Sequence, residues 1–282
     1  MKKVFIFLLL LLVILLAVSA AIALFQRSVP LGEKIGVVRI EGPILDSKTA
    51  VDEITDYAKN QSIRAIILRV DSPGGAVAPS QEIYEEVRKA AAKKKVVVSM
   101  GSVAASGGYY ISAPASRIVA NPGTLTGSIG VIMEIPNIEG LMSKVGVKTE
   151  VIKSGRHKDM ASVFRGIGSE ERIILQNVLD DVHDQFIQAV AEGRKMPPGE
   201  VQKIADGRVF TGRQAVEVKL VDELGSFEDA VTVAAKLAGI KGEPTVVEKK
   251  EKTSLIDFLR GGLPKELSDL FPTVKIKYLF SP

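Results

Sequence analysis

The sequence has no cysteine and no tryptophan, and only two histidines occur among its 282 residues. The absence of cysteine excludes disulfides, thiol catalysis and zinc sites built on cysteine ligands. Lys and Arg are scattered among Asp and Glu, without a basic stripe interleaved with aromatic residues. Nucleic-acid binding therefore has little support. Since no cluster of metal ligands and no phosphate-binding loop is visible, we expect neither a metal nor another cofactor.

What the chain does have is a long uncharged run near its start. Residues 4–24, VFIFLLLLLVILLAVSAAIAL, are long enough to cross a bilayer as a helix. The apolar core of a cleaved signal peptide is shorter, about 7–15 residues. The length favours an uncleaved anchor, while the small residues of SAAIA keep cleavage open as an alternative. Lys2 and Lys3 precede the run, and the positive-inside rule then predicts a cytoplasmic N-terminus. We expect residues 1–27 to form this N-terminus and the anchor.

Segments typical of strands alternate with segments typical of helices from residue 34 onward. Short runs rich in β-branched residues occupy 34–40, 63–70, 95–100 and 117–120. Apolar residues recur at helical spacing in 47–60, 80–94, 169–193 and 225–239. Ser169 is the expected N-cap of the third helix, and Ser226 with Asp229 has the spacing of a capping box. This alternation predicts an α/β sheet with right-handed crossovers.

Two glycines follow the second predicted strand, in the segment LRVDSPGGAVA (68–78). A glycine pair between a strand and a helix exposes backbone N–H groups, which can stabilise developing negative charge in an oxyanion hole. The segment is not a phosphate loop, because no Gly-Lys-Ser/Thr follows. A plain tight turn between a strand and a helix explains Gly74 and Gly75 equally well.

Ser106 lies among residues with very small side chains, in GSVAASGGYYISA (101–113). The segment follows a predicted strand and resembles the nucleophile elbow of hydrolases, with Ala104 where a glycine is usual. Such a turn exposes the serine, and the N–H of Gly107 can face the same oxyanion. The alternative is a helix start packed closely against the sheet.

The base that would activate Ser106 is harder to select. His183 falls near the apolar face of the helix predicted for 169–193, where a packed or rim histidine is expected. His157 stands beside Lys158 and Asp159 in KSGRHKDM (153–160), and neighbouring side chains diverge too much to form a triad. Lys158 is the better candidate, because a desolvated lysine can act as a general base. Its position alone would not select it from the other lysines.

Five motifs in this order resemble the signal peptide peptidase A family of membrane-bound serine proteases: DSPGG, MGSVAASGGYYISA, ANPGTLTGSIGV, SGRHKDM and GRVFTGRQAVEVKLVDELG. The resemblance spans about residues 34–238 and is to the short, single-domain form. It implies a ClpP/crotonase-like α/β fold of repeated β-β-α and βαβ units behind an N-terminal transmembrane helix. Residues 28–240 are then the catalytic protease domain. The extension 241–282 matches no motif, and its role stays open.

The resemblance also assigns roles to particular residues. It implies that Ser106 is the nucleophile and Lys158 the general base. Gly74, Gly75 and Gly107 would form the oxyanion hole, with Gly75 preferred within the pair. Ser128, in TGSIGV, would orient the lysine, since a hydroxyl can accept a hydrogen bond from an ammonium group.

The implied function is degradation of cleaved signal peptides, and of other apolar peptides, by a homo-oligomer with active sites shared between subunits. The implied location is the cytoplasmic (inner) membrane, with a single pass and the catalytic domain outside the cytoplasm. One alternative is a broader protease that removes misfolded membrane proteins or lipoprotein fragments. Another is an inactive oligomeric membrane scaffold, against which the intact Ser106 and Lys158 argue. A crotonase-type acyl-CoA enzyme would be cytosolic and would not need the anchor.

Overall fold

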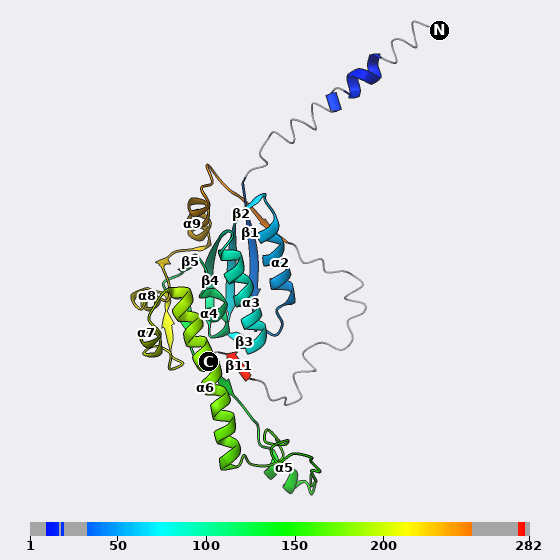
Figure 1. Ribbon diagram of the computed structural model, residues 1–282, viewed down its shortest axis with the longest axis vertical. Helices are drawn as coiled ribbons and strands as arrows, with labels where there is room; N and C mark the ends of the chain where they lie inside the picture. Colours follow the sequence, from blue (N-terminus) through cyan, green and yellow to red (C-terminus); the bar gives the residue numbers. More distant parts are fainter. Residues whose placement is uncertain (1–9, 17, 20–32, 250–275, 280–282) are drawn as a thin grey trace, which may run out of the picture.

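The computed structural model describes residues 10–16, 18–19, 33–249 and 276–279 (Figure 1). Residues 10–16 and 18–19 are helical, and the rest of the predicted membrane span 4–24 lies outside the described residues. Within the described part of the chain, no helix combines the length and the apolar character needed to cross a bilayer.

Six parallel strands form the centre of the main sheet. Their order is β10 (Thr245–Glu248), β1 (Lys34–Glu41), β2 (Ile63–Ser72), β4 (Lys95–Ala105), β5 (Arg117–Ala120) and β9 (Glu223–Leu224). Beyond β5, the far end of β4 pairs in parallel with β6 (Leu125–Gly127), and β6 pairs antiparallel with β8 (Val209–Thr211). The four strands predicted from β-branched runs are therefore confirmed, and they are neighbours in one sheet.

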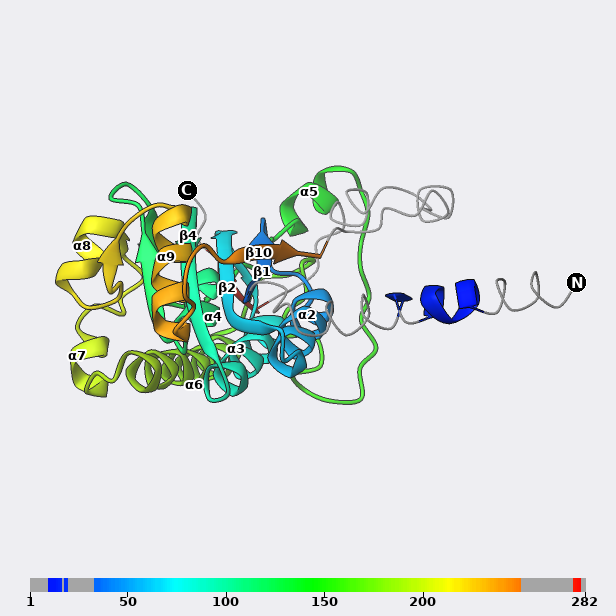
Figure 2. The same ribbon diagram turned by 90° about the horizontal axis from the view of Figure 1, so that it is seen from above.

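Helices cover both faces of this sheet, as the two-sided burial of its strands requires. One face packs against α2 (Lys48–Lys59), α3 (Val77–Ala91), α4 (Gly107–Ser112) and α6 (Ser169–Arg194), and the other against α9 (Phe227–Ala238). Successive residues of β2 divide between the faces, because Ile66 joins the first core and Ile67 the second. Figure 2 shows α2, α3 and α6 along one side of the strands. The short helices α7 (Pro198–Gln202) and α8 (Gly212–Glu217) follow α6.

The sequence predicts the N-cap of α9 correctly and that of α6 incorrectly. Ser226 caps α9, and its hydroxyl accepts from the Asp229 N–H at 3.3 Å while the Asp229 carboxylate accepts from the Ser226 N–H at 2.7 Å. The prediction that Ser169 caps α6 is wrong by one residue, because Gly168 is the N-cap. The Glu171 carboxylate accepts from the Gly168 N–H at 2.9 Å, so the cap is supplied from inside the helix.

An arm projects from the body between β7 (Ile132–Met133) and α6, and it includes α5 (Glu139–Lys144) (Figure 1). Its apolar side chains are largely exposed: Leu141, Val145, Val147, Val151, Ile152 and Phe164. Soluble monomers rarely expose contiguous apolar patches of more than a few hundred Å². Within the described part of the chain, no other segment covers these apolar side chains of the arm.

A second, smaller sheet lies where the main strands end. It consists of β3 (Gly74–Ala76), β11 (Ile276–Leu279) and β7, with β11 in the middle and antiparallel to both neighbours. Strands from the predicted extension 241–282 therefore join both sheets, β10 at the edge of the main one and β11 at the centre of the small one.

Candidate active site

Ser106 occupies a sharp turn between β4 and α4. Its backbone has φ 53° and ψ −116°, a conformation that residues with a side chain rarely adopt. Two hydrogen bonds hold the turn, from the Ser106 N–H to the Gly127 carbonyl and from the Tyr110 N–H to the Ser106 carbonyl, both at 2.8 Å. Only 1% of Ser106 is exposed, so the exposure expected of a serine at such a turn is not found in the single chain, and its Oγ has no hydrogen-bond partner among the described residues. The geometry is that of a nucleophile elbow carrying a free hydroxyl.

The glycines after Ser106 let other chain segments approach it closely. A Cβ on Gly107 would lie 2.8 Å from Ser80 Oγ and 3.1 Å from the Gly75 nitrogen. A Cβ on Gly108 would lie 2.7 Å from the Ser72 carbonyl oxygen. A larger residue at either position would push α4 away from the turn that bears the glycine pair.

The N–H groups of Gly74 and Gly75 face different ways. The Gly74 N–H donates to Ser72 Oγ at 3.1 Å, so it is already engaged. Ile44 pairs with one edge of β3, because its N–H donates to the Gly74 carbonyl at 2.9 Å and its carbonyl accepts from the Ala76 N–H at 2.8 Å. Alternate residues of a strand present their N–H groups to opposite edges. The Gly75 N–H consequently faces away from Ile44, and this favours Gly75 over Gly74 as the oxyanion donor.

Ser128 is brought to the same place by β6. It follows directly on Gly127, whose carbonyl accepts from Ser106. Its own backbone has φ 50°, and its N–H donates to the Arg208 carbonyl at 2.8 Å. Ser128 borders a hollow that Asp180 and His183 of α6 also line. His183 is half-buried there, as expected of a rim histidine, and its Nε2 is buried without a partner among the described residues.

Lys158 is not joined to Ser106 within one chain. It lies on the arm, its side chain is exposed, and its backbone N–H donates to the Gly155 carbonyl at 3.1 Å. Ser106, Gly75, Gly107 and Ser128 are gathered at one end of the sheet, whereas the predicted base is carried by a projecting segment. Neighbouring His157 has a 3.6 Å contact from Nε2 to Glu170.

The residue after Lys158 is fixed by a charged cluster at the base of the arm. Arg165 donates to the Asp159 carboxylate at 3.0 Å and to Glu171 at 2.8 Å, and Lys153 donates to Asp159 at 2.5 Å. Hydrogen bonds from Arg165 and Lys153 hold the pKa of Asp159 well below its usual range. Those from Arg165 and the Gly168 N–H lower the pKa of Glu171 to about 2. The cluster thus ties the Lys158 loop to the first turn of α6, a tie that sequence spacing did not reveal.

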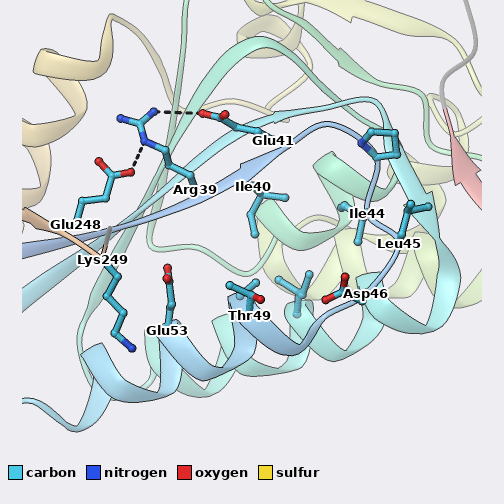
Figure 3. A pocket seen from close by; sticks show the side chains of 13 residues that line it. Arg39, Ile40, Glu41, Ile44, Leu45, Asp46, Thr49, Glu53, Glu248 and Lys249 are labelled. Atoms are coloured by element: carbon cyan, nitrogen blue, oxygen red, sulfur yellow. Dashed lines mark hydrogen bonds and ion pairs between the residues drawn. The ribbon is translucent and has the colours of Figure 1, made fainter. Parts of the chain in front are cut away.

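A separate hollow lies between the end of β1 and α2 (Figure 3). Its rim is charged, and Arg39 donates to Glu248 and, at 3.4 Å, to Glu41. Ile44 lines the hollow and also pairs with β3. The hollow is lined by none of the predicted catalytic residues.

A buried serine at an elbow, with backbone N–H groups beside it on an α/β sheet, defines a serine hydrolase. The family model for peptidase family S49 matches residues 88–241, and that for Clp protease matches residues 35–124. The chain belongs to peptidase family S49 and is a serine protease with a ClpP-like α/β fold.

Three relatives illustrate the family. The putative protease slr0021 of Synechocystis is 44% identical over 82% of this chain and 84% of its own length. Protease 4 of Salmonella typhi is 39% identical over 86% of this chain and 42% of its own length. A putative signal peptide peptidase SppA of Enterococcus faecium is 39% identical over 72% of this chain and 59% of its own length. The chain therefore matches only about half of the last two proteins.

The charged cluster leads to a prediction about the arm. Replacing Arg165 with methionine removes the link between Asp159 and Glu171, so the Lys158 loop should loosen. We expect kcat for an apolar peptide to fall about tenfold, as misplacing a catalytic group by about 1 Å costs up to 10²-fold. The melting temperature should change little. Arg172→Met, at an exposed position of α6, is the matched control; equal effects of the two variants would contradict the assignment.

Low pH should weaken the same link between Asp159 and Glu171. Because the folded-state pKa of Glu171 is lowered from 4.5 to about 2, its stabilising contribution is present above about pH 5 and is lost as the pH falls towards 2. Exchange of the Gly168 N–H, corrected for its intrinsic rate, should accelerate over this interval in the wild type. In the Arg165→Met variant the step should move to higher pH, because Glu171 loses the largest cause of its lowered pKa while the Gly168 N–H still donates to it.

Proposed function

We propose that the chain is a membrane-anchored serine endopeptidase that uses Ser106 and Lys158 to degrade cleaved signal peptides. The observation that carries the proposal is the free, buried hydroxyl of Ser106 at a strained turn beside the backbone of Gly75 and Gly107. Backbone strain of this kind costs about 1–3 kcal/mol and concentrates at functional sites.

The chemistry follows from these groups. The neutral amine of Lys158 takes the proton from Ser106 Oγ, which attacks the carbonyl carbon of the scissile bond. The N–H groups of Gly75 and Gly107 stabilise the negative oxygen that forms. Lys158 then passes its proton to the leaving amine, and water releases the acyl group from Ser106. Ser128 accepts from the Lys158 amine and orients it.

Three kinds of observation support the substrate class. The residues before and after Ser106 are small, and β3 and β7 each pair with an extended segment of this chain, β11, as they would with an extended peptide. A relative is named a putative signal peptide peptidase. The uncharged run 4–24 would place the enzyme where apolar peptides remain after secretion.

Substitutions at the dyad test the function. Ser106→Ala and Lys158→Ala should each lower kcat/KM for an apolar peptide by about 10³-fold or more, because nucleophile and base act as a unit. His157→Ala and His183→Ala should change it by less than about tenfold, since removing a general base costs at least about 10². Circular dichroism should be unchanged in all four. A loss with His157→Ala as large as with Lys158→Ala would refute the lysine base.

The base is supplied by a neighbouring subunit in this proposal. Lys158 is exposed on an arm whose apolar side chains are also exposed, while Ser106 Oγ has no hydrogen-bond partner among the described residues. Docking the arm on a second copy would cover those side chains and bring an amine to the hydroxyl. Such a head-to-tail contact forms a ring when the rotation between neighbouring subunits closes.

Mixing two inactive variants tests this arrangement. A Ser106→Ala chain would lend its lysine to the serine of a Lys158→Ala chain. After dissociation and random reassembly of the full-length chains in detergent at equal amounts, about a quarter of wild-type activity should return, because each interface needs both partners in one order. Each variant reassembled alone is the control. No recovery in mixed oligomers confirmed by mass spectrometry would place both residues in one chain.

Membrane topology gives a further prediction. With residues 4–24 as an anchor and its N-terminus in the cytoplasm, residues from about 28 onward lie outside. The chain has no cysteine, so Gln61→Cys introduces a single label at an exposed position. A membrane-impermeant maleimide should label it in intact spheroplasts. Labelling that requires lysis would reverse the orientation.

A further inference from the structure

A basic hollow lies at the end of the main sheet where its parallel strands begin. Four cations line it, Arg64, Lys93, Lys94 and Lys95, and no carboxylate is among the described residues of its walls. Its volume is about 650 Å³, and its other walls are apolar apart from Gln61. Basic pockets at a membrane surface bind the phosphate groups of lipids. The lining of this hollow therefore suits a phosphate that is attached to an apolar body.

Two of the cations are held close together by the fold. Lys94 Nζ donates to the carbonyls of Tyr57 at 2.7 Å and Asn60 at 2.5 Å, at the end of α2. A helix C-terminus carries partial negative charge, which accounts for a lysine at this place. Burial and the charge of neighbouring Arg64 lower the pKa of Lys94. An anion in the hollow would offset this repulsion between like charges.

The other two cations are not used inside the domain. Lys93 and Lys95 are exposed and have no ion pair among the described residues. Lys95 also borders a neighbouring hollow, whose carboxylates are Glu192 and Asp222. Asp222 is already paired with Arg194 at 2.7 Å. Lys93 and Lys95 are thus available to an anion from outside the chain.

The chain enters the domain from the predicted anchor at this same end of the sheet. β1 begins at Lys34, and Ile35 is in register with Ala65 of β2, which is in register with Lys95 of β4. Neighbouring strands are about 4.8 Å apart, so the start of β4 lies about 10 Å from that of β1. Residues 25–33, between the uncharged run and β1, can span at most about 30 Å. The hollow is therefore within reach of the membrane that the anchor would cross.

We propose that the basic hollow binds the phosphate headgroups of anionic phospholipids and rests this end of the sheet on the membrane surface. The inference rests on the membrane anchor in the proposed function but does not depend on the dyad. A Lys or Arg near an anionic lipid surface strengthens binding about fivefold. Because the anchor keeps the hollow close to the lipids, their effective concentration is high and a modest affinity is sufficient.

Docking in this orientation holds the nucleophile away from the bilayer. β4 runs from Lys95 to Ala105, and Ser106 follows at its far end. A strand of this length spans about 35 Å. A peptide must then leave the bilayer before its scissile bond reaches Ser106. The orientation favours peptides that have been released from the membrane over segments that still span it.

Fluorescence quenching of the full-length chain in nanodiscs tests the docking. The chain has no cysteine, so Ala92→Cys places a single fluorophore at the wall of the hollow. A nitroxide on a zwitterionic headgroup should quench it strongly when phosphatidylglycerol is present and weakly in phosphatidylcholine alone. A salt concentration of about 1 M should remove the difference, because the Debye length falls to about 3 Å. Ser102→Cys, an exposed position near the other end of β4, is the matched label and should stay unquenched.

Neutral substitutions test the role of the lysines. The double variant Lys93→Gln, Lys95→Gln should lower the ratio of docked to undocked chains about 25-fold, because each lysine contributes about fivefold. Lys48→Gln with Lys203→Gln removes the same charge from exposed positions outside the hollow and is the control. Both double variants should hydrolyse a soluble peptide in detergent as the wild type does. Equal quenching in the two double variants, or of the wild type in the two lipid mixtures, would overturn the proposal.

Inorganic phosphate distinguishes a lipid surface from a small anion as the occupant. In phosphatidylglycerol nanodiscs, phosphate should relieve the quenching no more than chloride of equal ionic strength. A specific effect of phosphate would identify a site for a small anion and refute docking on lipid.

Flotation with vesicles separates the failure of this inference from that of the proposed function. If the full-length chain does not float with vesicles, the anchor fails and this inference fails with it. If the chain floats and hydrolyses the peptide but the Ala92→Cys label is not quenched, only the inference fails.

Discussion

The close approach of three chain segments at the end of the main sheet is the constraint on which the site depends. The Ser106 turn, the Gly74–Gly75 turn and the end of β6 meet there, joined by the hydrogen bond from Ser106 to Gly127 and by the contact of Gly107 with Gly75. A strained φ of 53° at Ser106 persists only because these neighbours determine it. The pairing of β4 with β6 and the packing of α4 thus create the nucleophile's position.

Much of this arrangement could be predicted from the sequence because its signals are local. Small residues around Ser106 and the pair Gly74–Gly75 indicate backbones that must come close, and the β-branched runs indicate buried strands. The start of α6 was placed one residue late, since Gly168 has no capping side chain and Glu171 supplies the acceptor instead. The Arg165 cluster was not predicted either, because charges at such spacings are equally common on solvated surfaces.

The position of β11 could not be predicted for a different physical reason. Its four residues form too short a segment for periodicity to mark, in a stretch without a recognisable motif. What places them is an open strand edge elsewhere in the fold, where the Gly75 backbone has groups left to pair. An edge of this kind accepts extended chains largely through their backbones, so the sequence of the occupant carries little of the information.

Two features of the single chain both limit hydrolysis. The nucleophile has no base within hydrogen-bond reach among the described residues, and the edge beside it is filled by β11. For a protease that acts at a membrane, as we propose, both features limit premature hydrolysis, because among the described residues of one subunit no base reaches Ser106 and β11 fills the neighbouring edge. In our proposal, assembly supplies the amine of Lys158. Hydrolysis then requires two chains, so the rate depends on the population of the assembled state rather than on the elbow alone.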